Sequence, residues 1–184
     1  MALRRSSTGS VIHSDVLTAE ALFTEHRQQL FRYFYRTVGH AETARDLTQD
    51  VFVRVSRTAV PADGDAHVRA WLFRIARNLA LDHHRQRTRR PEAPLLAVVA
   101  VHAAQDVVAA INEALAQLSD VDRDVFLFRE VVGLGYAEIA ESCELTIDGV
   151  RNRLHRARLQ LRDALAAPIG AQRTRGIRLT TGEE

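Results

Sequence analysis

The chain has 184 residues, of which 46% are hydrophobic and 26% charged, and its formal net charge is +2. This composition is typical of a globular protein and excludes a disordered chain, while the single cysteine, Cys143, excludes an internal disulfide framework and indicates a reducing compartment. The longest nearly apolar run is too short to span a bilayer, and the first residues lack the apolar core of a signal peptide, so we expect a soluble cytoplasmic protein without membrane insertion.

Hydrophobic residues recur at helical spacing through the N-terminal half. In chain order the pattern predicts a flexible segment over 1–17, a helix over 18–38 that ends at Gly39, a second helix over 41–59, a loop "VPADGDAH" over 60–67, and a third helix from residue 68. Arginines gather between residues 69 and 90. They indicate either a contact with a polyanion or a solvated face.

The composition changes after Arg90. Residues 91–107 hold two prolines, no arginine and no clear period, which predicts a linker or a docking segment. A second helical block follows, in which Ser119 and Asp122 have the spacing of a capping box, with Ser119 as the N-cap and Asp122 reaching back to it. No strand signal competes anywhere, so we predict an all-α protein of two small helical domains joined by a linker.

The second domain ends in a predicted helix-turn-helix. Gly133–Gly135 end the preceding helix, "YAEIAESC" forms a short helix, and Thr146 caps a last helix that Pro168 stops. One face of the last helix is apolar, with Ile147, Val150, Leu154, Ala157 and Leu161. In this motif the second helix enters the major groove of DNA, where arginine reads guanine and asparagine reads adenine. The candidate DNA contacts are Arg151, Asn152, His155 and Arg156, and the alternative is a pair of short helices packed without any DNA.

Two blocks of sequence carry a family resemblance. The stretch "LSDVDRDVFLFREVVGLGYAEIAESCELTIDGVRNRLHRARLQLRDAL" resembles the promoter-binding C-terminal domain of bacterial sigma factors of the extracytoplasmic-function (ECF) group. In the N-terminal half, "ARDLTQDVFVRV" resembles the polymerase-binding helix of that group, and "AWLFRIARNLALDHHR" resembles its promoter-melting helix. The resemblance implies a sigma region 2-like domain over 18–90, a linker over 91–107, a region 4-like domain over 108–167 and a disordered tail over 168–184.

The resemblance also implies a function. Such a protein is not an enzyme: it binds core RNA polymerase and directs promoter-specific initiation of transcription, and the group often works with an anti-sigma factor. Core polymerase is expected to dock on Asp46, Gln49 and Asp50. The melted −10 element is expected to contact Arg74, Arg77, Asn78 and Arg85. The duplex −35 element is expected to contact the basic face of the last helix, at Arg151, Asn152, His155 and Arg156.

Three departures from the family pattern bear on promoter choice. Val60 stands where an aromatic residue is expected in the base-capturing loop, and Glu144 stands at the usual glycine of the turn, where a positive φ would strain it. Asp148 and Gly149 replace the usual Gly-Thr pair. Asp148 either repels phosphate or accepts a hydrogen bond from a cytosine amino group.

No chemistry beyond binding is expected. His83 and His84 point to different helix faces and Cys143 is a lone sulfur ligand, so we expect no metal and no cofactor, and we expect Cys143 to be a small core residue. Two alternatives remain beside the sigma factor: a sigma-like decoy that binds a regulator without promoter activity, and a simple helix-turn-helix repressor. The decoy has no need of the arginines, and the repressor does not explain the N-terminal block.

Overall fold

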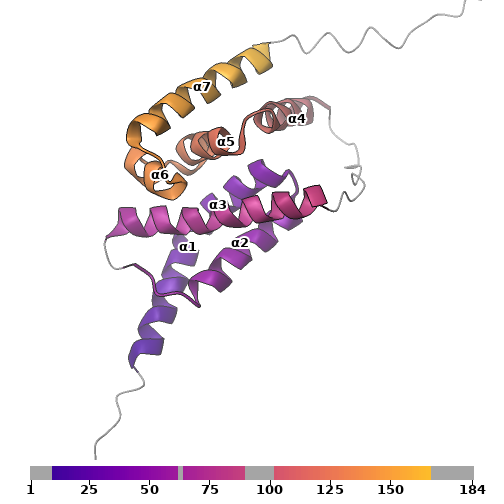
Figure 1. The fold of residues 1–184 in the computed structure, drawn as a ribbon. Coiled ribbons are helices and arrows are strands. Elements are labelled where there is room, and N and C mark those ends of the chain that lie inside the picture. The colour runs from indigo at the N-terminus through magenta and orange to yellow at the C-terminus, as the bar shows by residue number, and fades with distance from the viewer. Residues whose placement is uncertain (1–9, 62–63, 90–101, 167–184) are drawn as a thin grey trace, which may run out of the picture.

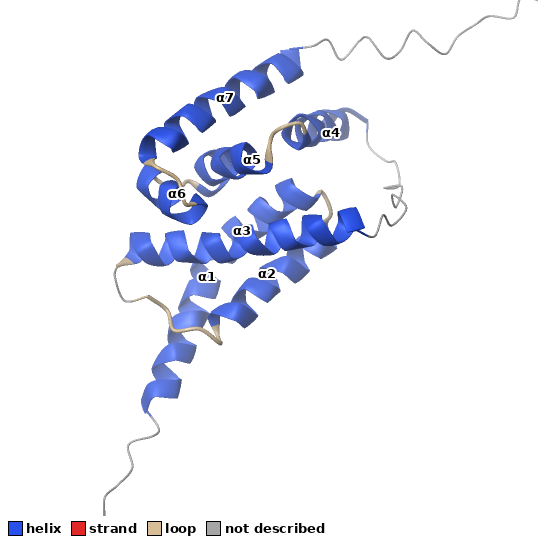
Figure 2. Ribbon diagram, in the orientation of Figure 1, coloured by secondary structure: helices blue, strands red, loops and turns tan. Residues whose placement is uncertain are grey.

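A computed structural model describes residues 10–61, 64–89 and 102–166 of the chain. These residues form seven α-helices and one π-helical turn without any strand, which confirms the predicted all-α class (Figures 1 and 2). Within the described part of the chain, no helix combines the length and the apolar character that crossing a membrane requires. The elements are α1 (Ser10–Val38), α2 (Ala41–Val55), α3 (Asp65–Arg89), α4 (His102–Ala116), α5 (Asp120–Leu127), the π turn η1 (Phe128–Val132), α6 (Tyr136–Cys143) and α7 (Ile147–Ala166).

Helices α1, α2 and α3 pack together through the apolar faces that the sequence predicts. Gly39 ends α1 as expected, because its φ of 74° is open to glycine at little cost. Helix α2 buries Leu47 and Val51, and α3 buries Leu72 and Phe73. Each such side chain contributes about 1.5–3 kcal/mol when it is fully buried. The burial of one face leaves the opposite faces of α2 and α3 exposed for binding.

Helix α5 begins with the cap that the sequence predicts. The Ser119 hydroxyl accepts a hydrogen bond from the Asp122 backbone N–H at 3.2 Å, which starts α5. The Asp122 carboxylate, which the sequence assigns to the cap, accepts hydrogen bonds from Arg153 and Arg156 of α7. Helix α5 continues into the π turn and stops at Gly133, whose φ is 84°. The short helix α6 and the longer α7 follow, as the sequence predicts.

Three helices begin earlier than the sequence indicates, and one of them is α3, which starts at Asp65 inside the expected loop 60–67. Helix α1 starts at Ser10, inside the segment 1–17 that we expected to be flexible, and α4 starts at His102, inside the expected linker 91–107. Alanine and other good helix formers dominate α4, and this propensity forms a helix where the apolar pattern shows no clear period. The rest of the expected linker and the expected disordered tail lie outside the described residues.

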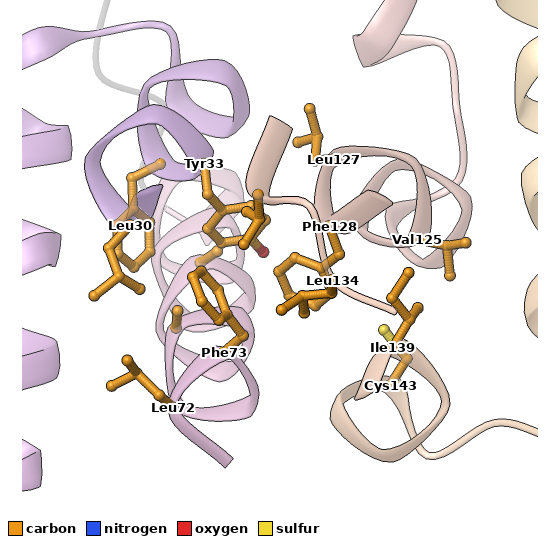
Figure 3. Packing of buried hydrophobic residues seen from close by; sticks show 14 of the residues in the cluster. Leu30, Tyr33, Leu72, Phe73, Val125, Leu127, Phe128, Leu134, Ile139 and Cys143 are labelled. Atoms are coloured by element: carbon orange, nitrogen blue, oxygen red, sulfur yellow. The ribbon is translucent and has the colours of Figure 1, made fainter. Parts of the chain in front are cut away.

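The chain has two halves, α1–α3 and α4–α7, and they share one hydrophobic core (Figure 3). Phe128 of η1 packs against Tyr33 of α1 and Phe73 of α3, with ring centroids 4.9 and 5.6 Å apart. All three rings are fully buried. Helix α6 lies along the N-terminal part of α3 (Figure 1). The sequence predicts the two helical units, and the structure adds that they pack directly on each other.

Candidate nucleic-acid interface

The turn between α6 and α7 is built on a strained residue. Glu144 has φ 57° and ψ 46°, which is the left-handed conformation that strains a residue other than glycine at this position. The turn is closed by a hydrogen bond from the Leu145 N–H to the Ala140 carbonyl at 2.8 Å. Thr146 then caps α7, because its hydroxyl accepts from the Gly149 N–H at 3.0 Å. The helix-turn-helix geometry therefore forms with a glutamate where glycine would be unstrained.

Helix α7 has the two faces that the sequence predicts. Val150, Leu154, Ala157 and Leu161 are buried against α5 and α6. Ile147 does not join them, because its side chain is 43% exposed. The opposite side is solvent-exposed and holds all four predicted −35 contacts, Arg151, Asn152, His155 and Arg156.

One buried carboxylate organises the arginines of this face. Asp122 accepts from Arg156 Nη2 at 2.9 Å and from Arg153 Nη1 at 3.0 Å. Burial of Asp122 opposes its ionisation, but the hydrogen bonds from Arg156, Ser119 and Arg153 hold its pKa below the ordinary value. The side chain of Arg156 is nonetheless 53% exposed, so it reaches solvent while its position is fixed.

Asp148, one of the three departures, neutralises part of the same face. Its carboxylate accepts from Arg151 Nη1 at 2.8 Å, and both side chains are exposed. The Arg151 guanidinium also lies 5.9 Å from the centre of the Tyr136 ring, which is within range of a cation–π interaction. Arg151 is therefore turned toward α6 in this structure, whereas Asn152 and His155 are exposed beside it.

A second basic region lies on α3 and the end of α2. Arg74 and Asn78 line an open hollow of about 360 Å³ on the N-terminal half. Trp71 also lines this hollow, although it is mostly buried, which agrees with its place on the apolar face. The basic rim is completed by two arginines outside the predicted set, Arg54 and Arg57. The sequence could have indicated these two arginines, because they come shortly before the predicted loop and do not fall on the apolar face of α2.

The structure separates Arg77 from the other predicted −10 residues. Arg77 is only 14% exposed and faces the C-terminal half, where its Nε donates to Asp124 Oδ2 at 3.0 Å. Tyr33 donates to the other oxygen of Asp124 at 2.8 Å. Burial raises the pKa of Asp124 to about 6, although Tyr33 and Arg77 both favour its charged form. Arg85 lies far along α3, exposed and 3.8 Å from Asp82.

A third face, on α2, is acidic and polar. Asp46, Gln49 and Asp50 are exposed on the side opposite the buried residues of this helix, and the structure brings them together as predicted. Gln49 also lines a hollow of about 710 Å³ between α1 and α2, together with Phe23 and Phe31. A hollow that combines two aromatic side chains with polar and basic ones, beside exposed carboxylates, is a suitable surface for a protein partner.

The next feature is the cysteine, considered as a reactive thiol, and the histidine and carboxylate side chains, considered as metal ligands. Burial raises the pKa of Cys143 to about 12, so the thiol stays protonated and acts as the small core residue that we predicted. Among the described residues, no group of three or more histidine, cysteine or carboxylate side chains is arranged to hold a metal ion.

Comparison with protein families matches both halves of the chain. The family model described as "Sigma-70 region 2" matches residues 22–90, and the model described as "Sigma-70, region 4" matches residues 109–161. The first match contains α2, α3 and most of α1. The second contains the helix-turn-helix and the basic face of α7.

Individual proteins agree with these matches. The RNA polymerase sigma factor YlaC of Bacillus subtilis (strain 168) is 29% identical over 161 residues, which cover 78% of this chain and 89% of YlaC. The ECF RNA polymerase sigma factor SigL of Mycobacterium tuberculosis (strain Erdman) is 34% identical over 152 residues, covering 77% of this chain and 85% of SigL. Among solved structures, CnrH in complex with the cytosolic domain of CnrY is similar with a TM-score of 0.62 and 27% identity, over 84% of this chain and 91% of CnrH.

Proposed function

The chain belongs to the ECF group of RNA polymerase sigma factors, which direct core RNA polymerase to promoters, and we propose how its three exposed faces divide this work. The observation that carries the proposal is the arrangement of α7. Its apolar side is buried in the domain, and its arginine, asparagine and histidine side chains are exposed together at the N-terminal half of the helix. That is the part of a recognition helix that reaches base edges.

We assign −35 recognition to Arg151, Asn152, His155 and Arg156. Arg156 is the strongest candidate, because Asp122 fixes its guanidinium while leaving it half exposed. A fixed arginine loses less conformational entropy when it binds guanine or phosphate. Asn152 offers both a donor and an acceptor to an adenine edge. Asp148 holds Nη1 of Arg151 and competes with DNA for this arginine.

We assign −10 recognition to Arg74, Asn78 and Arg85, with Arg77 joining them once its contact with Asp124 opens. Melting costs a few kcal/mol per unstacked base, which stacking, edge hydrogen bonds and phosphate contacts offset. The hollow between α2 and α3 supports the assignment, since Arg74 and Asn78 line it and Arg54 and Arg57 surround it with positive charge. We add Arg54 and Arg57 as phosphate contacts.

We assign core polymerase binding to Asp46, Gln49 and Asp50. These side chains are exposed on a helix whose other face is fixed in the core, so the surface is rigid as well as polar. The chain is proposed to act by binding alone, in the cytoplasm where polymerase and promoters are. We also propose an anti-sigma factor as its regulator; the similar protein CnrH was solved in complex with the cytosolic domain of CnrY.

Transcription from genomic fragments tests the whole proposal. Purified core polymerase is mixed with the chain and a fragmented genome, and the transcript starts are sequenced. We expect discrete starts that share two upstream motifs, and we expect Arg156→Ala, which leaves the α2 face intact, to weaken transcription from these starts. Binding to core polymerase without any discrete start would indicate the decoy instead. Absence of binding to core polymerase would overturn the function altogether.

A further inference from the structure

Asp148 lies on the same face of α7 as the residues assigned to DNA. The −35 candidates are residues 151, 152, 155 and 156, so Asp148 precedes them by three, four, seven and eight positions. Side chains at this spacing share one face of an α-helix. The Asp148 side chain is 82% exposed and open to solvent. A carboxylate therefore occupies the N-terminal end of a face that is assigned to a polyanion.

This carboxylate directs Arg151. Its Oδ1 accepts a hydrogen bond from Arg151 Nη1 at 2.8 Å, and the guanidinium also lies 5.9 Å from the centre of the Tyr136 ring. An exposed ion pair of this kind contributes little to stability, so its main effect is on where Arg151 points. Because Nη1 is the nitrogen that Asp148 engages, the Nε–Nη2 edge of Arg151 is left to donate to DNA. Within the described part of the chain, the second oxygen of Asp148, Oδ2, accepts no hydrogen bond.

The major groove offers few partners to a carboxylate at this place. Phosphates repel it, and the N-terminal residues of a recognition helix reach base edges. An ionised carboxylate only accepts hydrogen bonds. Guanine and thymine present acceptors to the groove, adenine presents an amino donor beside the acceptor N7, and cytosine presents an amino donor alone. Cytosine is therefore the base whose edge matches Asp148 without a repelling acceptor.

The base that pairs with cytosine matches Arg151. Guanine O6 and N7 accept two hydrogen bonds from one edge of an arginine. In an A·T pair the acceptors are divided between the two bases, so no single base takes both donors of that edge. A C·G pair thus offers one donor and two neighbouring acceptors, which complements the carboxylate and guanidinium that α7 holds side by side.

We propose that Asp148 and Arg151 together read one C·G pair of the −35 element, and that Asp148 determines this specificity. The proposal rests on the −35 recognition proposed above for α7. Asp148 accepts a hydrogen bond from the cytosine amino group, and Arg151 donates two hydrogen bonds to the guanine. The same carboxylate competes with phosphate for Arg151, which reduces binding to DNA of other sequence. The departure from the family pattern at Asp148 thereby narrows the choice of promoter.

Replacement of single base pairs tests this proposal. The full chain is bound to core polymerase, each base pair of the −35 element of a promoter found among the genomic fragments is changed to the other three, and transcription is measured. We expect one position at which C·G is preferred by about fivefold or more. Asp148→Asn should shift the preference at this position to adenine, because an amide donates to N7 and accepts from the amino group. A purely structural role of Asp148 would not change which base is preferred.

A second variant measures the competition with phosphate. Asp148→Ala should remove the preference at the same position and leave the other positions unchanged. It should also tighten binding of the full chain to duplex of random sequence, and steepen the slope of log affinity against log salt by about one, because Arg151 becomes free for one more phosphate. Asp163→Ala is the matched control: it also removes an exposed acid from α7, but beyond the DNA-binding face, and should preserve every base preference.

The possible results separate this proposal from the function on which it rests. If both Asp148 variants keep the natural preference at every position, Asp148 does not determine specificity, while −35 recognition by α7 still holds. A natural preference for any pair other than C·G at the position that the variants alter would overturn the assignment to cytosine. Weaker binding of Asp148→Ala to random duplex would overturn the competition with phosphate. Absence of any base preference in the natural chain would overturn −35 recognition itself.

Discussion

Arg156 of α7 holds Asp122 of α5 with two of its nitrogens: Nε donates to Oδ2 at 3.2 Å, and Nη2 donates to Oδ1 at 2.9 Å. The carboxylate is buried and the guanidinium is half exposed. Such a two-point contact sets the direction of the arginine as well as its charge. Asp122 is therefore a positioning residue for the −35 contact, acting through Arg156.

Asp122→Asn is expected to weaken binding to a −35 duplex about threefold to tenfold. The amide keeps the shape of the carboxylate but loses its charge, so Arg156 must be ordered by the DNA at an entropic cost of up to about 2 kcal/mol. Fluorescence anisotropy with labelled duplex measures the change. Asp120→Asn is the matched control, because Asp120 pairs with Arg123 on the same helix and not with α7.

A double-mutant cycle separates positioning from general damage. Arg156→Ala alone is expected to cost about 1–3 kcal/mol of −35 affinity if it contacts a base. In that background, Asp122→Asn should have almost no further effect, because the residue through which it acts is gone. Tighter DNA binding by Asp122→Asn would contradict this interpretation and show that Asp122 withholds Arg156 from DNA.

Asp50→Arg is expected to reduce affinity for core polymerase at least tenfold. The change reverses the charge of an exposed face without touching the buried side of α2, and a like charge opposite a complementary partner costs several kcal/mol. Titration of labelled core polymerase measures the affinity. Asp163→Arg is the control, since Asp163 is also an exposed acid but lies on α7; if both variants bind alike, the α2 face is not the docking site.

Glu144→Gly is expected to raise the stability of the chain by about 0.5–1 kcal/mol. The left-handed conformation costs a residue with a Cβ roughly 1–2 kcal/mol, and the greater freedom of glycine in the unfolded chain returns part of the gain. The melting temperature should rise by about 1–4 °C in a thermal unfolding scan. Glu144→Ala keeps the strain and should show no such rise; a lower melting temperature for the glycine variant would mean that the glutamate side chain stabilises the turn.

Local signals explain what could be predicted from the sequence. Gly39, Ser119 and Thr146 act on neighbouring residues, so the helix ends, the caps and the helix-turn-helix follow from short stretches of sequence. The side of α7 that faces solvent follows from its period. These features can be predicted from the local sequence without knowing how the rest of the chain folds.

Long-range contacts explain what could not be predicted. Arg77 and Asp124 are 47 residues apart in the sequence, and Tyr33 and Asp124 are 91 apart. Nothing in the period of α3 distinguishes the arginine that faces α5 from Arg74, which lines the hollow. A helical pattern predicts on which face of a helix a residue lies, but not which other element packs against that face. The packing of the two halves could therefore not be predicted from the sequence.

The raised pKa of Asp124 predicts a pH dependence of the stability of the folded chain. Its pKa is about 6 in the folded chain, raised by burial from an ordinary value of 3.8. Between these two values the folded state holds a proton that the unfolded state releases, so the free energy of unfolding falls as the pH rises through this window. The contribution is fully present below the ordinary pKa and is lost above about pH 6.

Urea unfolding of the natural chain and of Asp124→Asn at pH 5 and pH 7.5 measures this contribution. Asparagine binds no proton, so the stability of the natural chain relative to the variant should be lower at pH 7.5 than at pH 5. His83, whose pKa is lowered by burial and by Arg87, titrates in both proteins and cancels in the comparison. Asp122 titrates below the window, because its pKa is lowered. A relative stability that stays constant or increases with pH would show that the Tyr33 and Arg77 contacts keep Asp124 ionised throughout.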